Sequence, residues 1–213
     1  MLQIIADKNT FKFGLHIENI SKYKFYLGLL LFLIIGMLFG ALAAKGINKN
    51  FDATINDWFN SFFEFRRTSE FTNLFFSLFL SSFVFLIIIS LSSFGISGII
   101  ILPILMLIKG FGTCLISGIL YRDFSLSGIA FADLILLPFC VANDFIGVYI
   151  SGKGMELSSH FLSSLNDISA RGTVLKPKAI VFLKKLLLCV LCSAVISLAE
   201  AIFTKCFIKY FNF

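Results

Sequence analysis

Five long apolar runs constrain this chain more than any other feature of its sequence. A helix rises 1.5 Å per residue, so about 20 apolar residues cross a hydrocarbon core of about 30 Å. The pattern predicts an all-α polytopic bundle of about five transmembrane spans, as a single domain at 25–213 that follows an N-terminal segment at 1–24. The spans are expected at residues 25–44, 71–93, 99–120, 126–150 and 186–203.

The composition excludes several other classes of protein. Hydrophobic residues make up 58% of the chain and charged residues 14%, whereas soluble domains carry about 25% charged residues. A chain of this length cannot bury so much apolar surface in water, which excludes a soluble globular domain. Outside the apolar runs there is no basic cluster with interleaved aromatics, so we expect membrane lipid as the surroundings and no nucleic acid as a partner.

Basic residues that flank the spans predict the orientation. Ten lysines and arginines lie on the side of the N-terminal segment and seven on the opposite side. Because cytoplasmic loops carry the excess of Lys and Arg, the count favours a cytoplasmic N-terminus and an external C-terminus.

An amphipathic helix is predicted between the first two spans, over residues 51–65. Its aromatic residues recur at helical spacing on one face, opposite acidic and amide side chains, which suits the membrane interface. Two interpretations remain open: a connector that lies on the membrane, or a docking surface for an external partner. The candidate docking residues are Asp57, Trp58, Phe62 and Glu64.

Four charged residues fall inside apolar runs: Lys109, Asp133, Asp144 and Glu200. Each costs about 2.5–3.5 kcal/mol at a helix centre, so such residues normally face the bundle interior and pair. Asp133 and Asp144 are eleven residues apart, close to three helical turns, which predicts that both face one side and that one pairs with Lys109. The alternatives are placement near a helix end, which suits Glu200, and a proton or ion path.

Catalytic and metal-binding patterns are missing from the sequence. It contains no G-x-S-x-G, no H-E-x-x-H and no phosphate-binding loop with its lysine. We therefore expect no enzyme activity, no cofactor and no metal. Cys189 and Cys192 form a C-x-x-C within an apolar run, which we interpret as two small residues that pack on one helix face. Gly36 and Gly40 form a G-x-x-x-G, which serves either packing within the bundle or self-association into a homo-oligomer.

Four short stretches together resemble a known family, the stage II sporulation protein M family. They are SFGISG at 93–98, LPIL at 102–105, IKGF at 108–111 and GIL at 118–120. The residues that carry the resemblance are Phe94, Gly95, Ser97, Pro103, Lys109, Gly110, Phe111 and Gly118.

The resemblance implies a multi-pass protein in the membrane of an endospore-forming bacterium. Members of that family act with stage II sporulation proteins D and P, which degrade peptidoglycan, at the septum during engulfment. It thus implies a membrane scaffold that recruits and positions those partners without being a hydrolase itself. The alternative from another functional class is a transporter or permease subunit that uses the charged residues within the spans.

Overall fold

The computed structural model describes the backbone at residues 2–46, 49–123, 125–163 and 171–208. Side chains are described in the same ranges except at 2–22, 49–56, 58, 59, 125, 163 and 171–175. Every regular element in these ranges is helical. The helices are α1 (Leu2–Gly46), α2 (Lys49–Thr68), α3 (Phe71–Ser93), α4 (Gly98–Asp123), α5 (Ser125–Phe131), the π-helix η1 (Ala132–Leu136), α6 (Leu137–Ser163) and α7 (Arg171–Phe207).

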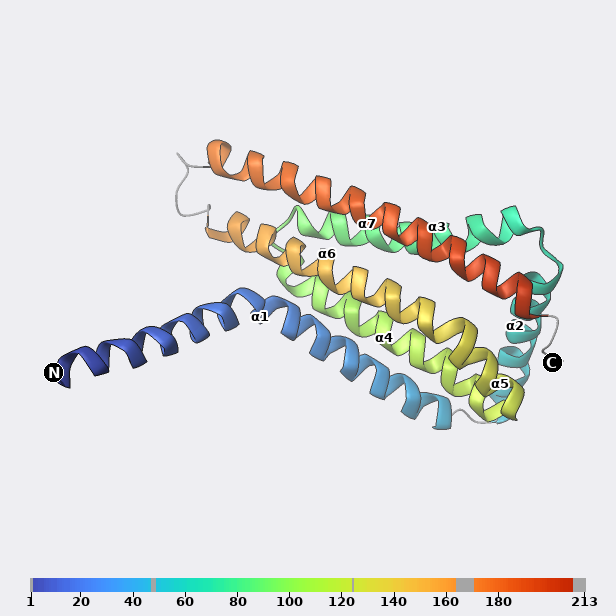
Figure 1. The fold of residues 1–213 in the computed structure, drawn as a ribbon. Coiled ribbons are helices and arrows are strands. Elements are labelled where there is room, and N and C mark those ends of the chain that lie inside the picture. The colour runs from blue at the N-terminus through green and yellow to red at the C-terminus, as the bar shows by residue number, and fades with distance from the viewer. Residues whose placement is uncertain (1, 47–48, 124, 164–170, 209–213) are drawn as a thin grey trace.

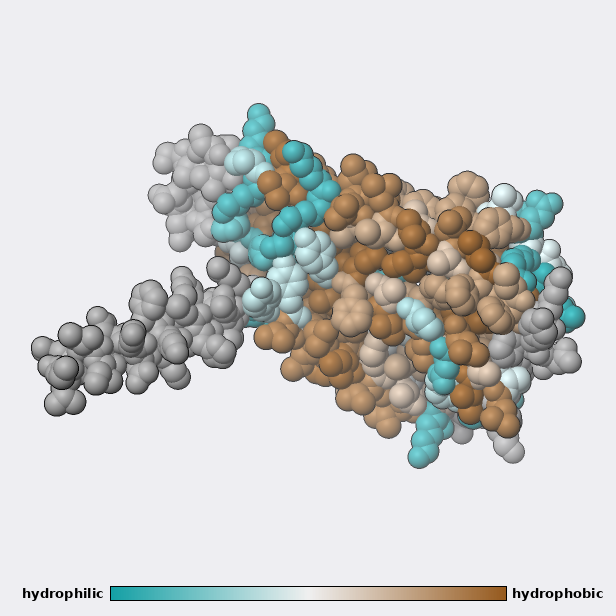
Figure 2. Space-filling view, viewed as in Figure 1, coloured by the Kyte–Doolittle hydropathy of each residue, from teal (hydrophilic) through white to brown (hydrophobic). Residues whose placement is uncertain are grey.

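Five of these helical stretches are long and apolar enough to cross a membrane, which confirms the predicted all-α class and the five spans. Hydrophobic residues cover the side of the molecule, and hydrophilic residues gather at its two ends (Figure 2). A chain with this surface is a multi-pass membrane protein. The candidate spans are Tyr23–Gly46, Phe71–Ser93, Gly98–Asp123, Leu126–Leu162 and Lys176–Phe207.

The spans form a bundle in which α1, α4 and α7 run in one direction and α3 and α6 in the other (Figure 1). α6 contacts α1, α3, α4 and α7, so it lies at the centre. One end of the bundle carries the tight turn at 94–97, and we call it the turn end. At the other end α2 runs across the bundle (Figure 1), and we call it the α2 end.

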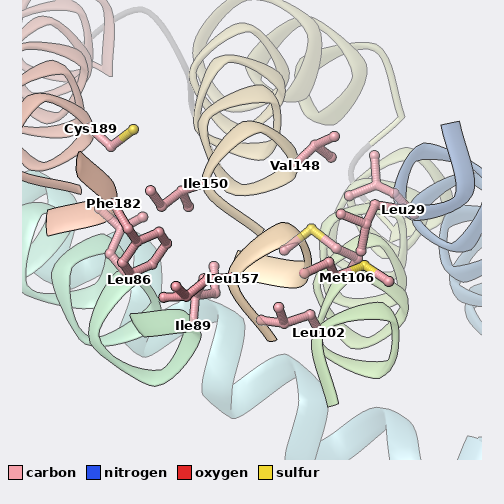
Figure 3. Close-up of a cluster of buried hydrophobic side chains, with 12 residues drawn as sticks. Leu29, Leu86, Ile89, Leu102, Met106, Val148, Ile150, Leu157, Phe182 and Cys189 are labelled. Atoms are coloured by element: carbon pink, nitrogen blue, oxygen red, sulfur yellow. The ribbon is translucent and has the colours of Figure 1, made fainter. Parts of the chain in front are cut away.

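Apolar side chains from all five spans meet in the core at the centre of the bundle. Figure 3 shows them in two groups on either side of α6: Leu29 of α1 and Met106 of α4 lie with Val148 of α6, and Leu86 of α3 lies with Phe182 of α7. A second cluster near the α2 end joins α1, α2, α4, α5 and η1. Its members are Ala44, Phe63, Ile119, Leu120, Phe131, Ala132, Ile135 and Leu136.

Glycines let the parallel helices α1 and α4 touch backbone to backbone. A Cβ atom at Gly36 would overlap the carbonyl oxygen of Leu107, and one at Gly40 would overlap that of Phe111. From the other side, a Cβ at Gly110 would overlap the carbonyl oxygen of Leu33. Of the two roles left open for the G-x-x-x-G, the structure thus shows packing within the bundle.

Small residues also allow α3 and α4 to pack closely against α6 at the turn end. A Cβ at Gly98 would overlap the Ser158 hydroxyl, and one at Gly154 would overlap the Ser93 hydroxyl. The Ser158 hydroxyl donates a hydrogen bond of 3.1 Å to the Ser93 carbonyl oxygen. Three helices therefore meet at this end through glycine and serine rather than through large side chains.

The fourth predicted span is not one regular helix, because η1 interrupts it at Ala132–Leu136. Pro138 explains the interruption, since its ring clashes with the carbonyl four residues earlier and it has no N–H to donate. A π-turn admits one extra residue. Each residue of an α-helix turns about 100°, so an extra residue rotates the flanking faces by about that angle.

Two helices begin earlier than the apolar runs suggest. α1 starts at Leu2 and continues across residue 24 into the first span. α7 begins at Arg171, fifteen residues before the predicted span at 186–203. Pro177 is exposed in the second turn of α7, and its missing N–H leaves one carbonyl oxygen of the first turn without a donor.

The glycine contacts between α1 and α4 give a direct prediction. Gly36→Ala and Gly110→Ala should each lower the free energy of unfolding by about 1–3 kcal/mol, because the new methyl group overlaps backbone of the partner helix. Gly28 and Gly112 lie on the same two helices and have open space around the position of a Cβ. Gly28→Ala and Gly112→Ala should be neutral or stabilising, since Ala favours a helix more than Gly does. Thermal unfolding of the four variants in detergent checks this, and equal melting temperatures would contradict the packing.

Candidate functional site: buried charges of the bundle

Lys109 lies in a small polar site between four helices. Its ammonium is 5.2 Å from the centre of the Phe85 ring, close enough for a cation–π interaction. The Ser193 hydroxyl of α7 donates a hydrogen bond of 3.1 Å to Asn143 Oδ1 of α6. Beside Lys109 is a cavity of about 10 Å³, which has room for about one water molecule. It is lined by Ser82, Phe85, Leu86, Lys109, Asn143, Ile146 and Ser193.

Asp144 is buried near this site but does not form an ion pair with Lys109. Its Oδ2 accepts a long hydrogen bond of 3.5 Å from the Thr113 hydroxyl. Among the described residues, its Oδ1 has no hydrogen-bond partner. The predicted direct pairing of Lys109 with an aspartate of span four is therefore wrong: the ammonium faces an aromatic ring instead.

Asp133 does not face the same side as Asp144. It is exposed, and its Oδ1 accepts a hydrogen bond from the Tyr121 hydroxyl at the end of α4. The prediction assumed a regular helix, in which eleven residues make three turns. η1 changes the rotation between the two carboxylates and turns one outward and the other inward.

Glu200 is buried about two turns before α7 ends at Phe207, so it lies near a helix end, but its carboxylate is paired inside the protein. Arg66 of α2 is also buried, and its Nη2 donates a hydrogen bond of 2.9 Å to Glu200 Oε1. Arg66 also lies over the Phe62 ring at 4.5 Å and reaches the Thr204 hydroxyl at 3.5 Å. Sequence reasoning missed Arg66 because it was counted among the basic residues of a loop. The signal that could have found it is its position one turn after Phe62 on the apolar face of α2.

Two further cations stabilise helix ends at the α2 end. Lys205 of α7 donates hydrogen bonds to the carbonyl oxygens of Arg67, at 3.2 Å, and Ser69, where α2 ends. Arg122 of α4 donates one of 3.2 Å to the carbonyl oxygen of Ala44, near the end of α1. The last carbonyls of a helix have no donor within the helix, and cations favour that end of its dipole. The Lys205 contacts and the Arg66–Glu200 pair attach α2 to α7, and the Arg122 contact joins α4 to α1.

The candidate docking residues on α2 divide into two groups. Asp57 and Glu64 are exposed. Phe62 is half-buried under Arg66, so it belongs to the contact with the bundle and does not offer a docking surface. Phe63 packs edge to face on Phe131, with 5.2 Å between ring centres. The side chain of Trp58 lies outside the described residues.

Several residues of the family-like motif serve helix packing. Gly110 contacts the backbone of α1, and a Cβ on Gly118 would lie 2.6 Å from the Ala44 Cβ. Phe94 packs edge to face on Phe182, with 5.7 Å between ring centres. Gly95 accepts a hydrogen bond of 3.2 Å from the N–H of Gly98 within the tight turn. The other members are Ser97 in that turn and Pro103, Lys109 and Phe111 on α4.

The structure does not assemble a metal-binding cluster in the described ranges, where no three His, Cys, Asp or Glu side chains come together. Cys189 is buried in the core, whereas Cys192 is exposed, and both thiols are free. The interpretation that both cysteines of the C-x-x-C pack on one face is therefore wrong for Cys192.

No protein-family model, no curated protein and no solved structure matches the chain.

The Arg66–Glu200 pair gives a prediction about stability, for which a substitution of the neighbouring Arg67 serves as the control. Arg66→Met should lower the free energy of unfolding by about 3–5 kcal/mol, because it leaves the Glu200 carboxylate buried without its partner. Arg66→Met combined with Glu200→Met should recover most of that loss. Arg67 is exposed, so Arg67→Met should change stability by less than about 0.5 kcal/mol. Denaturation in mixed micelles measures all three, and a double variant no more stable than Arg66→Met would rule out the coupling.

Proposed function

We propose that this protein is a membrane scaffold that recruits and positions peptidoglycan-degrading partners at the septum during sporulation engulfment. The observation that carries the proposal is the resemblance of residues 93–120 to the stage II sporulation protein M family. By that resemblance the partners are stage II sporulation proteins D and P. The protein itself has no turnover in this account.

The attachment of α2 supports a positioning role. A scaffold must hold its contact surface in a fixed place, and α2 is held at the end of the bundle by a buried ion pair and by Lys205. Its outward side carries the exposed residues Asp57, Asn60 and Glu64. These side chains can pair with basic or amide groups of a partner and need little reorganisation, because the helix that bears them is fixed.

The small cavity beside Lys109 also supports a scaffold over the alternative. Lys109 and the half-satisfied carboxylate of Asp144 at membrane depth favour a transporter or permease subunit. A transport path, however, needs a polar cavity that reaches the middle of the membrane. The cavity of about 10 Å³ beside Lys109 holds no more than about one water molecule.

The proposed orientation places the turn end in the cytoplasm and the α2 end outside, at the septal membrane. Lys45 at the α2 end and Lys176 near the turn end are both exposed. In a variant without the five native cysteines, an impermeant thiol reagent added to intact cells should label Lys45→Cys and not Lys176→Cys. Labelling of Lys176→Cys alone would reverse the orientation.

Charge reversal on α2 tests the scaffold. Asp57→Lys with Glu64→Lys should disperse the hydrolase partners from the septum and abolish their capture with the tagged protein from sporulating membranes. The membrane level of the protein itself should stay normal, because both side chains are exposed.

The control for this variant is Glu70→Lys with Asn73→Lys, which changes the charge by plus three where the α2 variant changes it by plus four. Both residues are exposed near the same end of the bundle, but they lie off the outward face of α2. The control should leave the partners at the septum. Unchanged partner localisation in the α2 variant would remove α2 as the docking surface, and purified protein that cleaved peptidoglycan by itself would contradict the scaffold.

A further inference from the structure

A second pocket lies between α6 and α7 at the turn end, away from the buried charges discussed above. Its volume is about 290 Å³, near the lower limit of about 300 Å³ for small-molecule sites. The space is therefore suited to a headgroup-sized ligand. The pocket is lined by Lys153, Glu156, Leu157, His160, Pro177, Lys178, Val181, Phe182 and Lys185.

The lining of this pocket is cationic. Three lysines and one glutamate give the described lining a charge of plus two, with the histidine neutral. Glu156 is already matched, since Lys153 Nζ donates to both of its oxygens at 2.7 and 2.8 Å. Lys178 and Lys185 form no ion pair with a carboxylate in the part of the chain that the structure describes. An anionic ligand in the pocket would therefore meet two ammonium groups that no described carboxylate neutralises.

His160 supports the same conclusion. Its Nε2 lies 2.9 Å from Lys178 Nζ. An ammonium group can only donate, so the ring nitrogen accepts and the imidazole is neutral at that atom. The contact fixes the position of the Lys178 ammonium without cancelling its charge.

The rest of the pocket lining is apolar. Leu157 and Phe182 are buried at its base, and Val181 is 52% exposed on the side of the bundle. The apolar outer surface of α7 continues from there through Leu187 and Leu188. Hydrophilic residues gather beside the hydrophobic surface at this end of the molecule (Figure 2). An anion with an acyl chain attached can contact both the lysines and the apolar residues, whereas a free anion can contact only the lysines.

We propose that this pocket binds the phosphate of an anionic lipid headgroup, such as that of phosphatidylglycerol. Lys178 and Lys185 contact the phosphate, and the acyl chains lie outside the pocket along Val181 and the apolar surface of α7. Basic pockets between transmembrane helices are suited to such headgroups. This assignment does not depend on the scaffold proposal or on the orientation of the bundle.

Lipid binding to the purified full-length protein tests the assignment. The protein in a neutral detergent is titrated with short-chain phosphatidylglycerol or phosphatidylcholine, and bound lipid is counted by native mass spectrometry. Phosphatidylglycerol should bind at least about tenfold more tightly, because phosphatidylcholine has no net charge. Lys178→Gln with Lys185→Gln should weaken phosphatidylglycerol binding about 25-fold, about fivefold for each lysine.

The matched control uses two other lysines of the same helix. Lys176 and Lys184 are exposed and do not line the pocket. Lys176→Gln with Lys184→Gln removes the same charge and should leave binding almost unchanged. Lys178→Arg with Lys185→Arg keeps the charge and should also retain binding. If the double Gln variant fails to fold, Lys185→Gln alone should show the fivefold loss.

Three results would overturn the assignment. Equal losses of phosphatidylglycerol affinity in the pocket variant and the control variant would show that only the overall surface charge matters. Equal affinity for the two lipids would show that the pocket does not select a negatively charged headgroup. Inorganic phosphate that bound as tightly as phosphatidylglycerol would assign the pocket to a soluble phosphate and not to a lipid.

Discussion

The backbone contact between α1 and α4 is the interaction on which the rest of the bundle depends. Within a membrane, lipid chains are as apolar as leucine side chains, so burial of apolar surface does not drive helices together. Close van der Waals contact must do so, and it needs residues without side chains at the crossing. Gly36, Gly40 and Gly110 provide that contact here. α6 can then pack against both helices, and its own small residues receive the turn between α3 and α4.

The membrane also constrains where charged residues can lie. A buried charge in hydrocarbon is costly without a partner, and Arg66 and Glu200 pair with each other at the α2 end. Lys109 is satisfied differently, by the Phe85 ring and by a small polar site. The two arrangements have different consequences. The first joins α2 to the bundle, which suits a protein that holds a surface in place, whereas the second lies within the bundle and presents nothing outside it.

The sequence was sufficient to predict the spans, because a membrane imposes length and hydropathy on every helix that crosses it. It was also sufficient to predict the G-x-x-x-G as a contact site, although not which helix would fill it. It was insufficient at Asp133 and Asp144, because the rotation between them depends on the π-helix, which depends on how the chain accommodates Pro138. The burial of Arg66 could not be predicted from the sequence either. It requires knowing that α2 folds back on α7, a tertiary contact with no local signal beyond its spacing from Phe62.

The central claim is that the bundle holds α2 in one fixed position, so that its exposed face can position a partner. The distance between spin labels on α2 and α7 tests it most directly. Labels at Asn60→Cys and Lys184→Cys, both exposed positions, are measured in lipid nanodiscs in a variant without the native cysteines. The account predicts one narrow distance distribution, which broadens when Arg66→Met removes the ion pair. A broad or multiple distribution with Arg66 intact would contradict it.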